Sequence, residues 1–403
     1  MKKMMILGAG IYQLPLINAA RRLGFETIAV SIPGNYPGFQ AADRVLLFDT
    51  RDKEQVLKAA AEEKVAGICT TGTDVAVSSI GYACGRLGLP GIPVRSAEVL
   101  CNKALMKEAF LKHGVRCAFG RRAYHVSQAI EIAREIGYPV VVKRVDSSGS
   151  RGITAVFEED GMQEAFRLAA ERTNQDYVLV EKMLKGIEIG VDGFIRDHKI
   201  VFFAPHAKFI YHGEHSTVPV GHTFPCPLSE SALADLREQL QLAADATGAD
   251  ACCFNADVFM DGDQAWLIEL GGRCGATCIP ELIQAHYGFD YYEAMLLEAS
   301  GGKAAFPSRE GTVPCMAKLI TSPTEGVITG IDMERLEQIR RSGIQVVIDY
   351  PVATHVFAMS DGTDRLGHVL AKTDREGVLD EAVSRVQSCI EINGKSLEEL
   401  WRS

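Results

Sequence analysis

Long apolar segments are lacking in this sequence of 403 residues, since its apolar runs stay far below the ~20 residues that a membrane-spanning helix needs. The start of the chain lacks the apolar helix and small-residue cleavage site of a secretory signal. The 11 cysteines form no CxxC pair and the histidines form no HExxH motif, so a zinc site is not predicted. Basic residues are too few for a nucleic-acid binder, because the formal net charge is −10. These deficits predict a cytoplasmic protein with reduced thiols and without a membrane or nucleic-acid partner.

Strand and helix patterns alternate in the first quarter of the chain. Short apolar strands are predicted at residues 4–8, 25–30, 44–48 and 67–70, and helices at 53–63 and 74–87. Such alternation is typical of a doubly wound parallel sheet. Because the chain is long for a single domain, further domains are expected after this one.

The first turn of this region carries only part of a dinucleotide-binding motif. Gly8 and Gly10 are present, but Gln13 takes the third glycine position of GxGxxG. That glycine permits close packing of helix on strand, so nicotinamide or flavin binding is the weaker alternative. We expect the turn to line a cleft for a small substrate at the carboxyl ends of the strands. Asp74 is either a helix N-cap or a residue facing the same cleft.

An acidic hairpin is predicted at residues 254–273, with strands at 255–260 and 265–271. A turn centred near Asp263 would place Asp257 opposite Glu269. Two carboxylates facing each other in a sheet repel, and a hard divalent cation between them would reverse that effect. The alternative is a solvated acidic edge. Period-2 alternation assigns the residues of the hairpin to two faces. The face with the two acids would contain Asn255, Asp257, Phe259, Leu267, Glu269, Gly271 and Arg273. The core face would contain Ala256, Val258, Met260, Trp266, Ile268 and Leu270.

Two further segments have the residue types that nucleotide binding needs. Lys143 ends a predicted strand at 140–143 and precedes a small, polar loop up to Gly152, whose backbone N–H groups could close over phosphates. An exposed hairpin loop is the alternative. After a strand that ends near Glu181, an apolar linker leads to a strand that opens with Glu188. This linker could hold an adenine ring while Glu188 accepts hydrogen bonds from ribose hydroxyls.

Taken together, these motifs resemble those of the ATP-grasp superfamily of ligases. The matching segments are Asn102-Lys103 at the start of a predicted helix at 102–113, VVKRVDSSGSRG, VEKMLKGIE, and the paired acids that end in IELGGR. The resemblance implies an N-terminal doubly wound parallel-sheet α/β domain at 1–95 and a split ATP-grasp α+β domain at 96–305, with a lid subdomain at about 115–185. A small C-terminal α+β domain would occupy 306–403.

The resemblance also implies ligands and roles, with ATP and Mg²⁺ (or Mn²⁺) bound in this domain. Lys103 and Lys143 would bind phosphates, and Asp257 and Glu269 would hold the metal. Arg273 and Lys143 would be the catalytic residues. The lid would contain Ser147, Ser148, Gly149, Ser150 and Gly152, and the adenosine site would contain Glu181, Lys182, Met183, Leu184 and Glu188. The family usually has Asn where this chain has Gly271, so water or Asn255 could supply that ligand.

The activity implied by the resemblance is an ADP-forming carboxylate–amine ligase that uses an acyl phosphate and acts on a small metabolite, with an amino acid as one candidate. A phosphoribosylamine–glycine ligase-like purine enzyme and a non-catalytic ATP-binding regulatory protein are the alternatives. A homodimer is expected. Candidate substrate contacts are Arg273, Thr277 and the segment from His206 to His222, for which a surface-exposed polar loop is the other interpretation.

Overall fold

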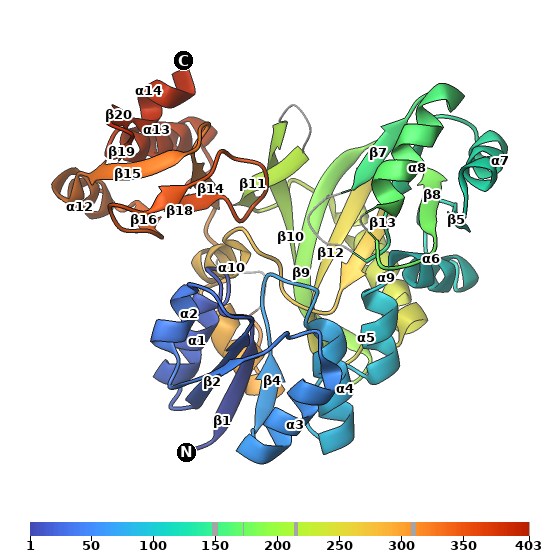
Figure 1. Ribbon diagram of the computed structural model, residues 1–403, viewed down its shortest axis with the longest axis horizontal. Helices are drawn as coiled ribbons and strands as arrows, with labels where there is room; N and C mark the ends of the chain where they lie inside the picture. The colour runs from blue at the N-terminus through green and yellow to red at the C-terminus, as the bar shows by residue number, and fades with distance from the viewer. Residues whose placement is uncertain (147–151, 172, 213–216, 308–311, 403) are drawn as a thin grey trace. The chain divides into compact units, whose positions relative to one another are not determined.

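The computed structural model describes residues 1–146, 152–171, 173–212, 217–307 and 312–402 (Figure 1). It is a mixed α/β protein that divides into two compact units. The first comprises Met1–Ala204, Pro227–Gly275 and Tyr292–Phe306, and the second comprises Pro205–Cys226, Ala276–Tyr291 and Pro307–Ser403. Within the described ranges, every helix is too short or too polar to cross a membrane. The division into three domains stays a prediction.

The N-terminal part of the first unit is a parallel sheet of order β3-β2-β1-β4, as the alternation predicts. The middle strands β1 and β2 are buried along nearly their whole length, because helices cover the sheet on both sides (Figure 1). Asp52 caps α3 by accepting a hydrogen bond from the Gln55 backbone. The elements are β1 (Lys3–Leu7), α1 (Leu14–Arg22), β2 (Glu26–Ser31), α2 (Pro37–Ala41), β3 (Arg44–Leu47), α3 (Lys53–Glu63), β4 (Gly67–Cys69), α4 (Val77–Leu87) and α5 (Val94–Leu100).

The side chain of Gln13 fills the glycine-rich turn between β1 and α1. Its Oε1 accepts from the Gly10 backbone N–H at 3.0 Å, and its Nε2 donates to the carbonyl of Thr71, after β4. A Cβ on Gly8 would come within 2.9 Å of the Gln13 side chain. The turn is therefore occupied by the residue that replaces the third glycine, where a dinucleotide phosphate would otherwise approach the backbone.

A four-stranded antiparallel sheet of order β5-β8-β6-β7 follows α6 (Lys103–Lys112) in the first unit. Helices α7 and α8 pack on one face of this sheet through Ala129, Ile132, Ala165 and other apolar residues. The opposite face presents Lys143 on β6 and Glu181 on β8. The elements are β5 (Gly120–Ala123), α7 (Val126–Ile136), β6 (Val140–Lys143), β7 (Ile153–Val156), α8 (Met162–Ala170) and β8 (Val178–Lys182).

The predicted acidic hairpin is formed by β12 (Cys252–Asp261) and β13 (Gln264–Gly271), and β12 also pairs with β9 (Ile187–Arg196). Asp257 lies opposite Glu269, as expected. The predicted faces of β13 are wrong before Glu269, because the register shifts between Asp257 and Val258. This bulge turns Leu267 into the core with no exposure and leaves Trp266 and Ile268 partly exposed. The remaining elements of this unit are α9 (Glu230–Thr247), α11 (Tyr291–Ala299) and the start of β10 (Lys199–His212).

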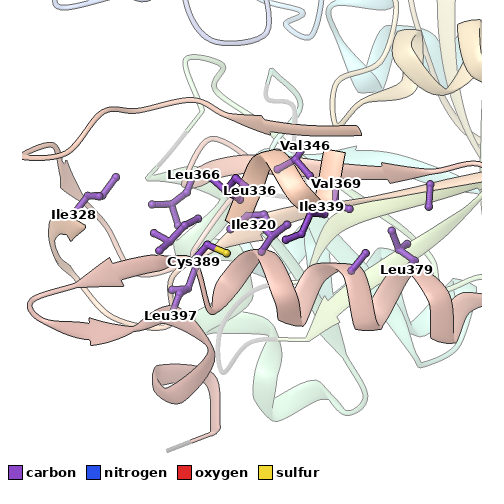
Figure 2. Packing of buried hydrophobic residues seen from close by; sticks show 14 of the residues in the cluster. Ile320, Ile328, Leu336, Ile339, Val346, Leu366, Val369, Leu379, Cys389 and Leu397 are labelled. Carbon is purple, nitrogen blue, oxygen red and sulfur yellow. The ribbon is translucent and has the colours of Figure 1, made fainter. Parts of the chain in front are cut away.

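The second unit has its own hydrophobic core, in which α12 and α13 pack against β14, β16 and β18 (Figure 2). Leu336 and Ile339 of α12 and Leu379 of α13 meet Ile320 and Val369 of the sheet. The unit comprises the end of β10 with β11 (Thr217–Phe224), α10 (Ile279–Tyr287), β14 (Cys315–Thr321), β15 (Gly326–Ile331), α12 (Met333–Arg341), β16 (Gln345–Ile348), β17 (His355–Val356), β18 (Arg365–Ala371), α13 (Glu376–Gln387), β19 (Ile390–Ile392), β20 (Lys395–Ser396) and α14 (Leu397–Arg402).

Candidate active site

The paired acids of the hairpin lie beside the first residue of α6. Asn102 caps this helix by accepting hydrogen bonds from the Ala104 and Leu105 backbones, which fixes Lys103 at its first position. The Lys103 Nζ forms an ion pair with Glu269 Oε2 at 2.7 Å. Burial alone would lower the pKa of Lys103, but the carboxylates of Glu269, Asp74 and Asp257 outweigh burial and raise it. The ammonium of Lys103 therefore lies where the surrounding carboxylates stabilise a positive charge.

Arg273 lies directly after the hairpin and is held by side chains from two other segments. Its Nη2 donates to Asp74 Oδ2 at 2.6 Å, and its Nη1 donates to Asn255 Oδ1 at 3.0 Å. Burial would lower the pKa of the guanidinium, but Asp74 and other nearby carboxylates raise it further above its ordinary value. Asp74 is therefore not acting as the helix cap that was one of its predicted roles, since α4 begins only at Val77. Its carboxylate faces the hairpin instead.

A second cluster consists of two buried lysines that share one buried glutamate. Glu181 on β8 forms ion pairs with Lys143 on β6 and, at 3.2 Å, with Lys107 on α6. Burial lowers the pKa of Lys143, with Glu181 offsetting part of the effect. Burial would raise the pKa of Glu181, but the two lysines lower it below its ordinary value. The three side chains carry a net charge of +1, so an anion would be stabilised beside them.

The two clusters adjoin each other through α6 and the segment after β6. The backbone N–H of Lys103 donates to the carbonyl of Val145 at 2.9 Å, and the charge of Lys103 contributes to lowering the pKa of Lys143 after burial and Lys107. The acidic cluster contains Asp74, Asp192, Asp257 and Glu269 against Lys103 and Arg273, which is a net charge of −2. An acidic site next to a basic one fits a phosphate chain carrying a divalent cation.

The donor set also fits magnesium in particular. Asp257 and Glu269 supply hard oxygen ligands, and among the described residues no three His, Cys, Asp or Glu side chains could hold a metal by themselves. Magnesium commonly takes one or two carboxylates and completes its shell with water and phosphate oxygens. Asp257 and Glu269 would hold the ion, which would neutralise charge on the transferring phosphoryl group.

The remaining predicted site residues differ in where they lie relative to these two clusters. Lys182 turns away, because its Nζ donates to the carbonyl of Gly137 at 2.8 Å. Met183, Leu184 and Glu188 are partly exposed on the linker and the start of β9. Gly186 between them has φ +138°, and a Cβ there would lie 2.4 Å from the Met260 carbonyl, so only glycine fits. Gly152 is in a turn before β7, whereas Ser147, Ser148, Gly149 and Ser150 lie outside the described residues.

The segment from His206 to His222 belongs to the second unit and is a strand pair, not a surface loop, in its described part. The rings of His206 and His222 are buried, with centroids 4.5 Å apart. Burial holds the pKa of His222 well below its ordinary value, aided by His206 and Lys208. The neutral ring of His222 is therefore unsuited to pair with a carboxylate as a cation. Thr277, another predicted substrate contact, is also buried in this unit.

The sequence did not identify Lys107 or Asp192 as members of these clusters, and it suggested a different role for Asn255. Lys107 follows Lys103 by one helical turn, and this i, i+4 spacing could have placed it on the same side of α6. Asp192 gave no signal beyond being an acid in a strand whose other residues are mostly apolar. Asn255 was one of two candidates, with water, for the ligand that Gly271 does not supply, and in the structure its amide binds Asp192 and Arg273.

Comparison with known proteins finds similarity to one family over this region and beyond it. A family model described as an ATP-grasp domain matches residues 136–281. A formate-dependent phosphoribosylglycinamide formyltransferase of Thioalkalivibrio sulfidiphilus (strain HL-EbGR7) is 30% identical over 291 residues, covering 67% of this chain and 69% of that protein.

Solved structures show the same similarity over nearly the whole chain. The crystal structure of phosphoribosylglycinamide synthetase from Anaerococcus prevotii is similar with a TM-score of 0.79 and 25% identity, covering 98% of this chain and 100% of the other. That of L-amino acid ligase from Bacillus licheniformis has a TM-score of 0.77 and covers 98% of this chain and 99% of the other. At 17% identity, this second likeness is one of fold alone.

Proposed function

The chain belongs to the ATP-grasp family of enzymes, and on this premise we propose that it is an ADP-forming ligase that joins a small carboxylate to an amine. The observation that carries the proposal is the pair of adjoining clusters. The Lys107–Glu181–Lys143 cluster carries the net positive charge that a phosphate chain needs, and the cluster with Asp257, Glu269 and Arg273 combines metal ligands with a guanidinium. Guanidinium groups bind carboxylates and phosphates in a fixed planar geometry.

The chemistry follows from what each cluster can bind. A carboxylate oxygen of the substrate attacks the γ-phosphorus of ATP, the bond to the bridging oxygen breaks, and ADP leaves. The nitrogen of an amine then attacks the acyl carbon, loses a proton, and displaces inorganic phosphate. Lys143 stabilises negative charge on the phosphoryl oxygens, and Arg273 orients the carboxylate and the acyl phosphate. In the phosphoryl-transfer step, catalysis is mostly positioning and charge stabilisation.

The proposal is tested by incubating purified protein with Mg²⁺–ATP and pools of amino acids and small carboxylic acids, and by resolving ADP, AMP and phosphate separately. We expect ADP and phosphate to form in equal amounts and only in pools that contain both substrates. AMP with pyrophosphate would overturn the mechanism. ATP binding without turnover in any pool would favour a non-catalytic nucleotide-binding protein.

A second candidate, favoured by the relatives, is an enzyme that acts on a phosphoribosyl amine. Its test is a separate pool that contains phosphoribosylamine with glycine and phosphoribosylglycinamide with formate, which are the reactants that the names of the two phosphoribosylglycinamide enzymes suggest. ADP formation confined to this pool would identify a phosphoribosyl amine, rather than a free amino acid, as the amine that is joined to the carboxylate. Turnover in the amino-acid pools alone would exclude the purine alternative.

Gly271→Asn is expected to lower the kcat of ADP formation by about 10-fold, although it introduces the residue that the family usually carries. A Cβ at position 271 would lie 3.0 Å from Asp74 Oδ1, so an asparagine side chain must displace the carboxylate that holds Arg273. Steady-state kinetics with Gly271→Ala as the smaller control measure this effect. An asparagine variant as fast as the wild type would contradict the assignment of that space to Asp74.

A further inference from the structure

A buried carboxylate is joined to Arg273 through the side chain of Asn255. Asp192, in the middle of β9, has no exposed surface. One of its oxygens accepts from the Gly275 backbone N–H at 2.6 Å, and the other accepts from Asn255 Nδ2 at 2.8 Å. Burying a charge is costly unless hydrogen bonds and an opposite charge compensate it. A nearby opposite charge is the guanidinium of Arg273. Burial would lower the pKa of Arg273, but Asp74, Glu269 and Asp192 raise it.

The sheet register explains why these side chains meet. Asn255 on β12 is paired with Asp192 on β9 on one side and with Gly271 on β13 on the other. Because Gly271 has no side chain, the amide of Asn255 is next to Arg273, and its Oδ1 accepts from Nη1 at 3.0 Å. The chain of contacts therefore runs from a buried acid, through an amide, to the guanidinium.

The chemistry of the amide makes this chain directional. An ionised carboxylate can only accept hydrogen bonds, so Asp192 must face the NH₂ end of Asn255. The carbonyl end is then left to face Arg273, which can only donate. A reversed amide would oppose donor to donor at Arg273 and acceptor to acceptor at Asp192. The charge of Asp192 thus sets the orientation of the group that holds Nη1.

Asp192 also holds the backbone that carries Arg273. The Gly275 N–H that it binds is two residues after Arg273, and the intervening carbonyl of Cys274 accepts from the Gly72 N–H at 3.2 Å. The carboxylate of Asp192 therefore holds both the guanidinium, through Asn255, and the backbone that follows Arg273. A side chain that acts only by filling space would not need an acceptor for both.

We propose that Asp192 is a positioning residue that holds Arg273 in its reactive orientation through Asn255 and the Gly275 N–H. The inference rests on the proposed function, because Asp192 acts on the substrate only through Arg273. Its role is to set where the guanidinium points when the carboxylate substrate binds.

The test exchanges the two side chains that form the chain of contacts. Asp192→Asn should lower the kcat of ADP formation by about 10- to 100-fold, while the KM for Mg²⁺–ATP changes by less than about threefold. Asn255→Asp should be at least as severe, because it sets two carboxylates against each other. The exchange Asp192→Asn/Asn255→Asp restores every contact: Asn at 192 accepts from Gly275 and donates to Asp at 255, which accepts from Arg273. We expect its kcat to return to within about threefold of the wild type.

Asp235→Asn is the matched control. Asp235 also accepts from a backbone N–H, that of Ala265, and from a guanidinium, that of Arg116, both at 2.7 Å. This variant should lower the melting temperature without lowering kcat. Rescue of kcat in the exchange variant supports the proposal, because a merely structural acid would lower the melting temperature in Asp192→Asn while leaving kcat unchanged, as in the control. Wild-type kcat in Asp192→Asn, or an exchange variant worse than either single variant, would overturn it.

Crystal structures of the wild type and Asp192→Asn keep the inference separate from the proposed function. If the wild type forms no ADP in any pool, the proposed function fails, and the position of Arg273 still decides the inference. A guanidinium displaced in Asp192→Asn and restored in the exchange variant supports a positioning role. An unchanged guanidinium in Asp192→Asn would overturn it.

Discussion

The double variant Asp257→Asn/Glu269→Gln should lose Mg²⁺-dependent ADP formation by at least about 10³-fold. The two carboxylates face each other across β12 and β13, and both changes keep the shape of the side chains while removing the charge that a divalent cation needs. Removing Glu269 also removes the ion-pair partner of Lys103 at 2.7 Å. The measurement is the initial rate of ADP release at saturating Mg²⁺–ATP with the substrates found in the pool assay.

The fold should survive this double change. Repulsion between the facing carboxylates is relieved, but Lys103 loses its Glu269 partner, so we expect the metal-free protein to stay folded with a lowered melting temperature. Asp263→Asn is the matched control, because Asp263 lies in the turn of the same hairpin and binds Ser229 and Ser231 instead. Full activity in the double variant, or an equal loss in Asp263→Asn, would show that the metal assignment is wrong.

Local patterns in the sequence account for much of the fold. The helix at 53–63 and the strand at 140–143 have the predicted bounds, since a capping Asp52 and the Gly137–Pro139 break mark their ends. The pairing of Asp257 with Glu269 was predicted from a turn centred near Asp263, but the observed turn pairs Asp261 with Gln264, and a bulge is needed to bring Glu269 opposite Asp257. The bulge beside Asp257 could not be predicted, because a single unpaired residue leaves no trace in an alternating pattern. It is this bulge that lets Glu269 face outward while Leu267 enters the core.

The site was less predictable, because its contacts join distant parts of the chain. Asp74 and Arg273 are 199 residues apart, and Asp192 and Gly275 are 83 apart. The periodicity of a single helix or strand gives no information about contacts between residues so far apart in the sequence. Motif order identified Lys103, Lys143 and the paired acids, since these belong to segments that resemble a known family. The residues that orient them depend on how three strands align, and that is fixed by packing of the whole unit.

Glu181→Gln should destabilise the protein by about 3–5 kcal/mol at neutral pH, the usual cost of removing one partner from a buried ion pair. Glu181 is the counter-ion of both Lys143 and Lys107, which are almost completely buried. Glutamine keeps the volume but leaves two ammonium groups facing each other in a site with little water. Urea unfolding would measure this in a Trp401→Phe background, where Trp266 on β13 is the remaining tryptophan and reports on the first unit.

The pH dependence of this loss identifies its cause. The pKa of Glu181 is lowered in the folded protein, so its contribution is present above its unfolded pKa and disappears as the pH falls through the folded value. The pKa of Lys143 is also lowered, so the unfolded chain binds more protons in the alkaline range and stability rises with pH there. The deficit of Glu181→Gln should accordingly be largest near neutral pH and shrink in acid and in alkali.

Charge matching provides the decisive control. Adding Lys107→Met to Glu181→Gln returns the cluster to its original net charge of +1, and the double variant should recover at least half of the lost stability. Glu164→Gln, which breaks an exposed ion pair with Arg167, should leave stability unchanged. If the double variant were no more stable than Glu181→Gln, unpaired charge could not be the cause. Lost packing or lost hydrogen bonds would then be responsible, and those should not vary with pH.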